Sequence, residues 1–78
     1  MIESKVETRT FGELYDSLNE VMQYEIREKI KSLCLCSESA VRNWRKGHRR
    51  PQAIYQANIV KAFKSIGIIT RPEFLFPR

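Results

Sequence analysis

The sequence contains few of the residues from which reactive, metal-binding or cross-linked sites are built, with one histidine and two cysteines among 78 residues. Cys34 and Cys36 are separated by a single residue, which is too close for a useful disulfide scaffold. A structural zinc site needs about four ligands, and only His48 remains as a further soft ligand. We therefore expect no metal and no other cofactor, with both cysteines packed as small hydrophobic residues.

Long hydrophobic runs are also missing. No uncharged stretch approaches the roughly 20 apolar residues that span a bilayer, and the charged N-terminus does not resemble a secretory signal. We expect a cytoplasmic protein with no membrane association. The length fits one domain and leaves little room for an enzyme cleft, and a lone histidine offers no nucleophile–base pair. The sequence therefore predicts a binding module that is not an enzyme, with no small-molecule substrate evident.

Charge of the two signs is unevenly distributed along the chain. The whole sequence carries a formal charge of +5. Residues 1–36 hold five basic and seven acidic side chains, whereas residues 37–78 hold nine basic and only two acidic ones. Such an asymmetry between halves favours a polyanionic partner for the second half.

Residues that cap or terminate helices occur along most of the chain, and no strand is expected. Capping-box patterns begin at Thr10, Ser17 and Thr70, and Ser37 is a good N-cap. Gly47 and Gly67 are natural helix stops, and Pro51 excludes helix just before it, so residues 48–50 form a basic loop. The predicted fold is all-α, a compact four- to five-helix bundle spanning residues 10–78, after a flexible arm of residues 1–9. The expected helices are 11–18, 20–33, 38–46 and 52–65, followed by a short turn near residues 72–76.

The segment 38–46 has two contrasting faces when it is drawn as a helix. Ala40, Val41 and Trp44 form one compact apolar face, so we interpret Trp44 as a core anchor rather than a platform for stacking bases. The outward face is polar and mostly cationic, and a helix of this kind fits the major groove of DNA. We predict that bases are read by Glu38, Ser39, Arg42 and Asn43.

Each of these residue types matches a base edge. Arginine can donate two hydrogen bonds to guanine O6 and N7, and asparagine pairs with adenine N6 and N7. Serine bonds to several base edges, and glutamate accepts from the cytosine amino group. Contacts to the DNA backbone give affinity and register without sequence information. We assign those contacts to Ser37, Arg45, Lys46, His48, Arg49 and Arg50.

Residues 37–51, SESAVRNWRKGHRRP, resemble the phage-repressor and Cro type of helix-turn-helix domain, the lambda-repressor-like family. The resemblance implies a helix-turn-helix formed by residues 20–33 and 38–46, with the second helix in the major groove. It implies a sequence-preferring double-stranded DNA-binding protein, a small transcriptional regulator located with the nucleoid. If the module acts alone, a homodimer is expected, because two half-sites mirror a two-fold axis.

The sequence departs from the family pattern in the first helix of the motif. Counting back from Ser37 places Lys31 where the family normally has a small residue that packs against the recognition helix. The turn before Ser37 could therefore be longer than usual, which leaves the register of the preceding helix open.

Two other functions compete with DNA binding. A protein-interaction module on the same fold would dock a partner through the acidic half or the apolar tail, and an RNA-binding module would be indifferent to duplex sequence. Residues 74–76, a Phe-Leu-Phe cluster, either cover the core or form a dimer contact.

Overall fold

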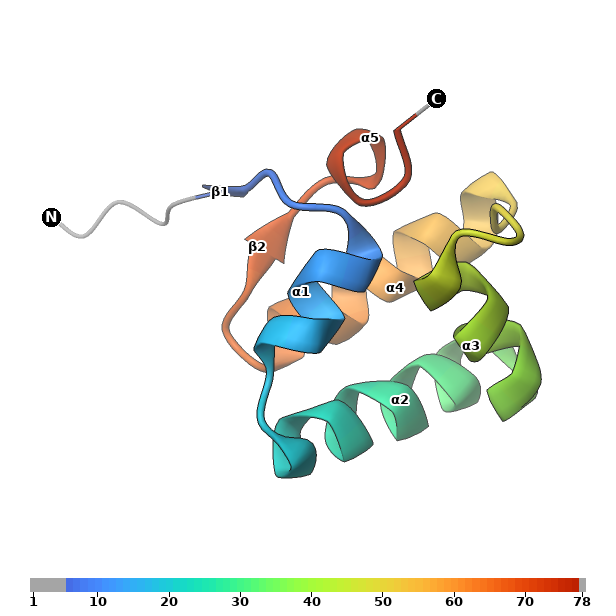
Figure 1. Cartoon of the computed structure of the whole chain (residues 1–78), viewed down its shortest axis with the longest axis horizontal. Coiled ribbons are helices and arrows are strands. Elements are labelled where there is room, and N and C mark those ends of the chain that lie inside the picture. Colours follow the sequence, from blue (N-terminus) through green and yellow to red (C-terminus); the bar gives the residue numbers. More distant parts are fainter. Residues whose placement is uncertain (1–5, 78) are drawn as a thin grey trace, which may run out of the picture.

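The computed structural model describes residues 6–77, which fold into five helices and one small sheet (Figure 1). The all-α prediction is confirmed, and the helix boundaries lie within one residue of those expected for the four longer helices. The elements are β1 (Val6–Glu7), α1 (Phe11–Ser17), α2 (Glu20–Cys34), α3 (Glu38–Lys46), α4 (Ala53–Ser65), β2 (Ile69–Thr70) and α5 (Pro72–Leu75).

Helix α1 begins at a complete capping box. The Thr10 hydroxyl accepts from the Glu13 amide at 3.3 Å, and the Glu13 carboxylate accepts from the Thr10 amide at 3.0 Å. The Thr10 amide and hydroxyl both donate to the Glu13 carboxylate, and these two hydrogen bonds lower the pKa of Glu13 below its ordinary value. The reciprocal bonds satisfy two groups that the first helical turn leaves without partners.

The other two predicted capping boxes are wrong, and in each case the hydroxyl has another partner. Ser17 donates to the carbonyl of Leu14 at 2.7 Å, and α2 is capped instead by Asn19, which accepts from the Met22 amide at 2.9 Å. Thr70 donates to the carbonyl of Glu7 at 3.0 Å, across the sheet, so α5 begins without a side-chain cap. Neighbouring structure, rather than the local tetrapeptide, decides where these hydroxyls bond.

Val6 and Glu7, part of the predicted flexible arm, form a strand, which contradicts the predictions of a flexible arm here and of a fold without strands. Residues 1–5 lie outside the described part of the chain, but Val6 and Glu7 pair in parallel with Ile69 and Thr70. Strands of two residues carry almost no sequence signal, because pairing across 63 residues depends on the fold that brings them together. Figure 1 shows this sheet beside α1, on the side of the molecule opposite α3.

A single core forms where α1, α2, α3, α4 and α5 meet. Helices α2 and α4 pack along each other, and Phe11 of α1 contacts the rings of Phe63 and Phe76 at 5.9 and 5.6 Å between centroids. Leu75 and Phe76 are buried, which confirms that this part of the 74–76 cluster covers the core, whereas Phe74 is half-buried. No helix within residues 6–77 has the length and apolar character needed to cross a membrane.

Candidate nucleic-acid interface

A tight turn of three residues, Leu35, Cys36 and Ser37, joins α2 to α3. The turn is therefore not longer than the three to four residues typical of helix-turn-helix units. Leu35 adopts the left-handed conformation with φ 52° and ψ 44°, and its amide and that of Cys36 both donate to the carbonyl of Lys31. This geometry fixes the register of α2. Lys31 lies in its last turn, half-buried, with its ammonium 3.2 Å from Glu28.

The predicted division of α3 into two faces is confirmed. Val41 and Trp44 are buried, and the Trp44 ring stacks on Tyr55 of α4 at 5.9 Å. Ser37 accepts from the Ala40 amide at 3.3 Å and begins the helix, and Gly47 ends it with φ 78°. Because α3 packs against α1 and α2 and its Trp44 stacks on Tyr55, the opposite face of the helix is turned outward.

The four predicted base-reading residues lie together on that outward face. Glu38, Ser39 and Arg42 are exposed, and Asn43 is half-buried. Glu38 and Arg42 are four residues apart and approach to 3.9 Å, so the acid and the cation partly neutralise each other in the free protein.

Arg27 of α2 was missed by the sequence analysis. Its Nε lies 3.2 Å from the Glu38 carboxylate, and this Nε is buried without a hydrogen bond among the described residues. The same guanidinium donates to the Tyr15 hydroxyl at 3.4 Å and lies over the ring of Tyr24. Arg27 therefore holds Glu38 from the side of α2. No periodic or motif signal in the sequence connects these two residues.

Arg45, predicted to contact the DNA backbone, has a partner within the protein. Its Nε and Nη2 donate to the Asp16 carboxylate at 2.8 and 2.5 Å, and its guanidinium lies 4.5 Å from the centre of the Tyr15 ring. Asp16 was not predicted, because it is 29 residues away in the sequence. The pair joins α1 to α3, and it offsets the charge of Arg45.

The same two helices approach closely at Gly12. A Cβ atom at this position would lie 2.6 Å from the carbonyl oxygen of Arg45, which is closer than van der Waals contact permits. Gly12 is therefore required for this packing, and α1 fixes the position of the C-terminal turn of α3.

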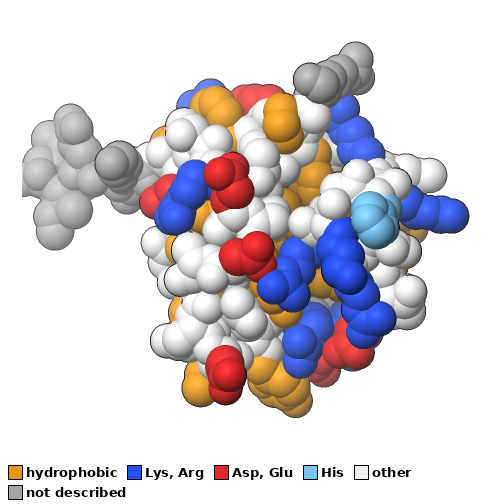
Figure 2. All heavy atoms as spheres, viewed as in Figure 1, with side chains coloured by type: hydrophobic (Ala, Val, Ile, Leu, Met, Phe, Trp, Pro, Cys, Tyr) orange, Lys and Arg blue, Asp and Glu red, His pale blue; other side chains and the backbone are white. Residues whose placement is uncertain are grey.

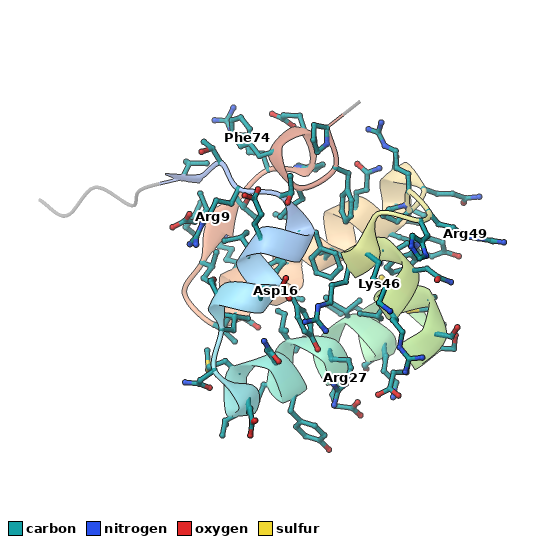
Figure 3. The ribbon with its side chains drawn as sticks, in the orientation of Figure 1. Arg9, Asp16, Arg27, Lys46, Arg49 and Phe74 are labelled. Carbon is teal, nitrogen blue, oxygen red and sulfur yellow. The ribbon has the colours of Figure 1, made fainter. Side chains whose placement is uncertain are left out.

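Four of the other predicted backbone-contact residues gather at the C-terminal end of α3, whereas Ser37 lies at its N-terminal end. Lys46, His48, Arg49 and Arg50 are all exposed, and the amides of His48 and Arg49 donate to the Asn43 carbonyl, which folds the loop back against the helix. Among the ion pairs of residues 6–77, none includes Lys46, Arg49 or Arg50. Figure 2 shows a band of basic side chains over this part of the surface, and Figure 3 places Lys46 and Arg49 away from Asp16.

The two cysteines flank the turn. Cys34 is buried and donates to the Tyr55 carbonyl at 3.8 Å, whereas Cys36 is half-buried. Burial raises the pKa of the Cys34 thiol to about 11 and also raises the pKa of Cys36. Both groups are therefore protonated thiols at neutral pH, with packing roles beside the turn.

Comparison of the chain with models of known protein families, with curated proteins and with solved structures finds no match in any of the three. The interpretation of this surface therefore depends on its own geometry and charge.

Proposed function

We propose that the protein is a sequence-preferring double-stranded DNA-binding module, a small transcriptional regulator that acts by binding and not as an enzyme. Helix α3 would lie in the major groove, with Lys46 and the loop of residues 48–50 on the phosphates. The observation that carries the proposal is the cluster of exposed cations without ion-pair partners, among the described residues, at the end of a rigid polar helix. A helix that contacts only solvent would not require its cations to be clustered in this way.

Base recognition would require a local exchange of partners. In the free protein Arg42 lies 3.9 Å from Glu38, and in the groove its guanidinium would turn to guanine O6 and N7. Arg27 remains beside Glu38, so the carboxylate keeps a cationic partner when Arg42 leaves it. Asn43, one residue along the helix, would pair with an adjacent adenine.

We expect the protein in the cytoplasm, associated with the nucleoid, and we expect a homodimer if the module acts alone. Leu75 and Phe76 are buried in the core, so they do not supply the dimer surface suggested by the sequence.

Fluorescence anisotropy tests the proposal with a duplex selected from a random pool, an unselected duplex and single-stranded RNA. We expect Arg42→Ala and Asn43→Ala to weaken binding to the selected duplex by about 1–3 kcal/mol, about 5- to 150-fold, with little change on the unselected duplex. Lys61→Ala, on the exposed surface of α4, is the matched control and should leave both affinities nearly unchanged. Equal losses on every duplex, or preference for the RNA, would contradict the proposal.

A further inference from the structure

A cavity of about 380 Å³ lies where α1, the end of α3, the loop of residues 48–50 and the C-terminal segment meet. Its volume falls within the roughly 300–1,000 Å³ typical of small-molecule sites. No sequence pattern predicts this cavity, because its walls come from three separate parts of the chain.

The inner wall of the cavity is apolar and rigid. It is formed by Phe11, Trp44, Leu75 and Phe76, all of which also belong to the buried core. Gly12 adds a stretch of wall without a side chain, and it cannot carry one because of the close approach to Arg45. Such a wall binds hydrocarbon or aromatic groups by removing their surface from water.

The rim of the cavity is cationic. Lys46, His48, Arg49 and Arg50 surround one side, and none of the described residues that line the cavity is acidic. Figure 2 shows hydrophobic side chains at the bottom of the recess beside the single histidine, with basic side chains around it. Lys46, Arg49 and Arg50 have no ion-pair partner among residues 6–77, whereas Arg45, which also lines the cavity, is paired with Asp16.

We propose that this cavity binds a small amphipathic anion, with an apolar chain or ring against Trp44 and Phe76 and a carboxylate or phosphate among the rim cations. Both head groups accept charge-assisted hydrogen bonds from arginine and lysine. The site deepens the proposed function, since the cations of the rim are those assigned to DNA phosphates. A bound anion would compete with DNA for these cations. Each ligand would then lower the affinity of the protein for the other ligand by the same factor.

The three glycines of the chain provide a direct test by nitrogen–proton NMR of the full-length protein. Gly12 and Gly47 line the cavity, whereas Gly67 lies at the end of α4, outside it. We would titrate octanoate, octyl phosphate and octan-1-ol below micelle-forming concentrations. The expected result is a saturable shift of the Gly12 and Gly47 amide signals with one or both anions, no shift of Gly67, and a matching change in the emission of Trp44, the single tryptophan. The two anions distinguish a carboxylate from a phosphate head group.

A pair of charge variants checks the role of the rim. The double variant Arg49→Gln/Arg50→Gln should bind the anion at least about tenfold more weakly, which corresponds to about 1.4 kcal/mol. The double variant Lys61→Gln/Lys64→Gln removes the same charge from α4 and should change the affinity by less than about twofold. Equal affinity for octan-1-ol and for the tighter-binding of the two anions, shifts of all three glycines, or no shift at all would each overturn the proposal.

These measurements separate the two proposals, because they are made without DNA. Anion binding by a protein that binds no duplex would refute the DNA-binding function and leave the cavity assignment intact. DNA binding without any glycine shift would refute the cavity assignment and leave the DNA-binding function intact. If both hold, the anion that binds the cavity should weaken duplex binding by the wild type.

Discussion

The salt dependence of duplex binding should report how many phosphates the cations at the end of α3 neutralise. Lys46, Arg49 and Arg50 are exposed and carry no ion pair among the described residues, so each can displace one condensed counterion. We expect the triple variant Lys46→Gln/Arg49→Gln/Arg50→Gln to bind all duplexes more weakly and with a flatter dependence on salt.

The magnitude follows from counting contacts. Each neutralised phosphate contributes about 0.9 to the slope of log K against log salt, so three contacts contribute about 2.7 per bound chain. Between 50 and 200 mM salt each contact costs about 3.5-fold in affinity, and three cost about 40-fold. Arg45 should contribute less than a full contact, because Asp16 lies 2.5 Å from its guanidinium and already offsets its charge.

Anisotropy titrations of one labelled duplex at several salt concentrations measure the slope for each protein. The single variant Arg49→Gln should reduce it by about 0.9, and the control Lys61→Gln should leave it unchanged. If the triple variant keeps the wild-type slope, these cations do not contact phosphates and another surface binds the nucleic acid. If Lys61→Gln reduces the slope as much as Arg49→Gln does, only the total charge of the protein matters.

Three further predictions concern the fold around this surface. Leu35→Asn should raise the free energy of unfolding by about 0.5–1 kcal/mol, because asparagine tolerates the left-handed backbone at this position. The leucine side chain is 91% exposed, so little packing is lost. A lower melting temperature of the variant would show instead that the leucine makes a stabilising contact. A thiol reagent should modify Cys36 before Cys34 in the native protein, as mass spectrometry can follow, and equal rates would contradict the burial of Cys34. Because the folded pKa of Glu13 lies below 4.5, its stabilisation is present above that pH and is lost as the pH falls below it. The stability difference between wild type and Glu13→Gln, measured by denaturant unfolding, should therefore shrink on acidification, and a difference independent of pH would contradict this role.

The sequence alone predicted the helices because their signals are local. Ser37 and Gly47 cap α3 through hydrogen bonds that span three or four residues, and the apolar positions Val41 and Trp44 identify its inward face. The position of the four candidate base-reading residues on the outward face follows from the helical repeat. No contact with distant parts of the chain was needed to place them together.

Tertiary structure decided the features that join distant residues. Three contacts connect helices or strands that no local sequence signal links. They are the pairing of β1 with β2, the ion pair of Arg27 with Glu38 and the ion pair of Asp16 with Arg45. The same cause redirected the hydroxyl of Thr70 from a cap to a strand partner.

The sequence therefore determined which residues face outward from α3, because a helix repeats every 3.6 residues whatever surrounds it. Only the tertiary structure decided which of the outward cations lack a partner and which, like Arg45, are already paired. It also created the cavity beside α3, whose walls converge from both ends of the chain. The physical reason is that charge pairing and the space left between elements depend on the distances between those elements, which are set when the elements pack.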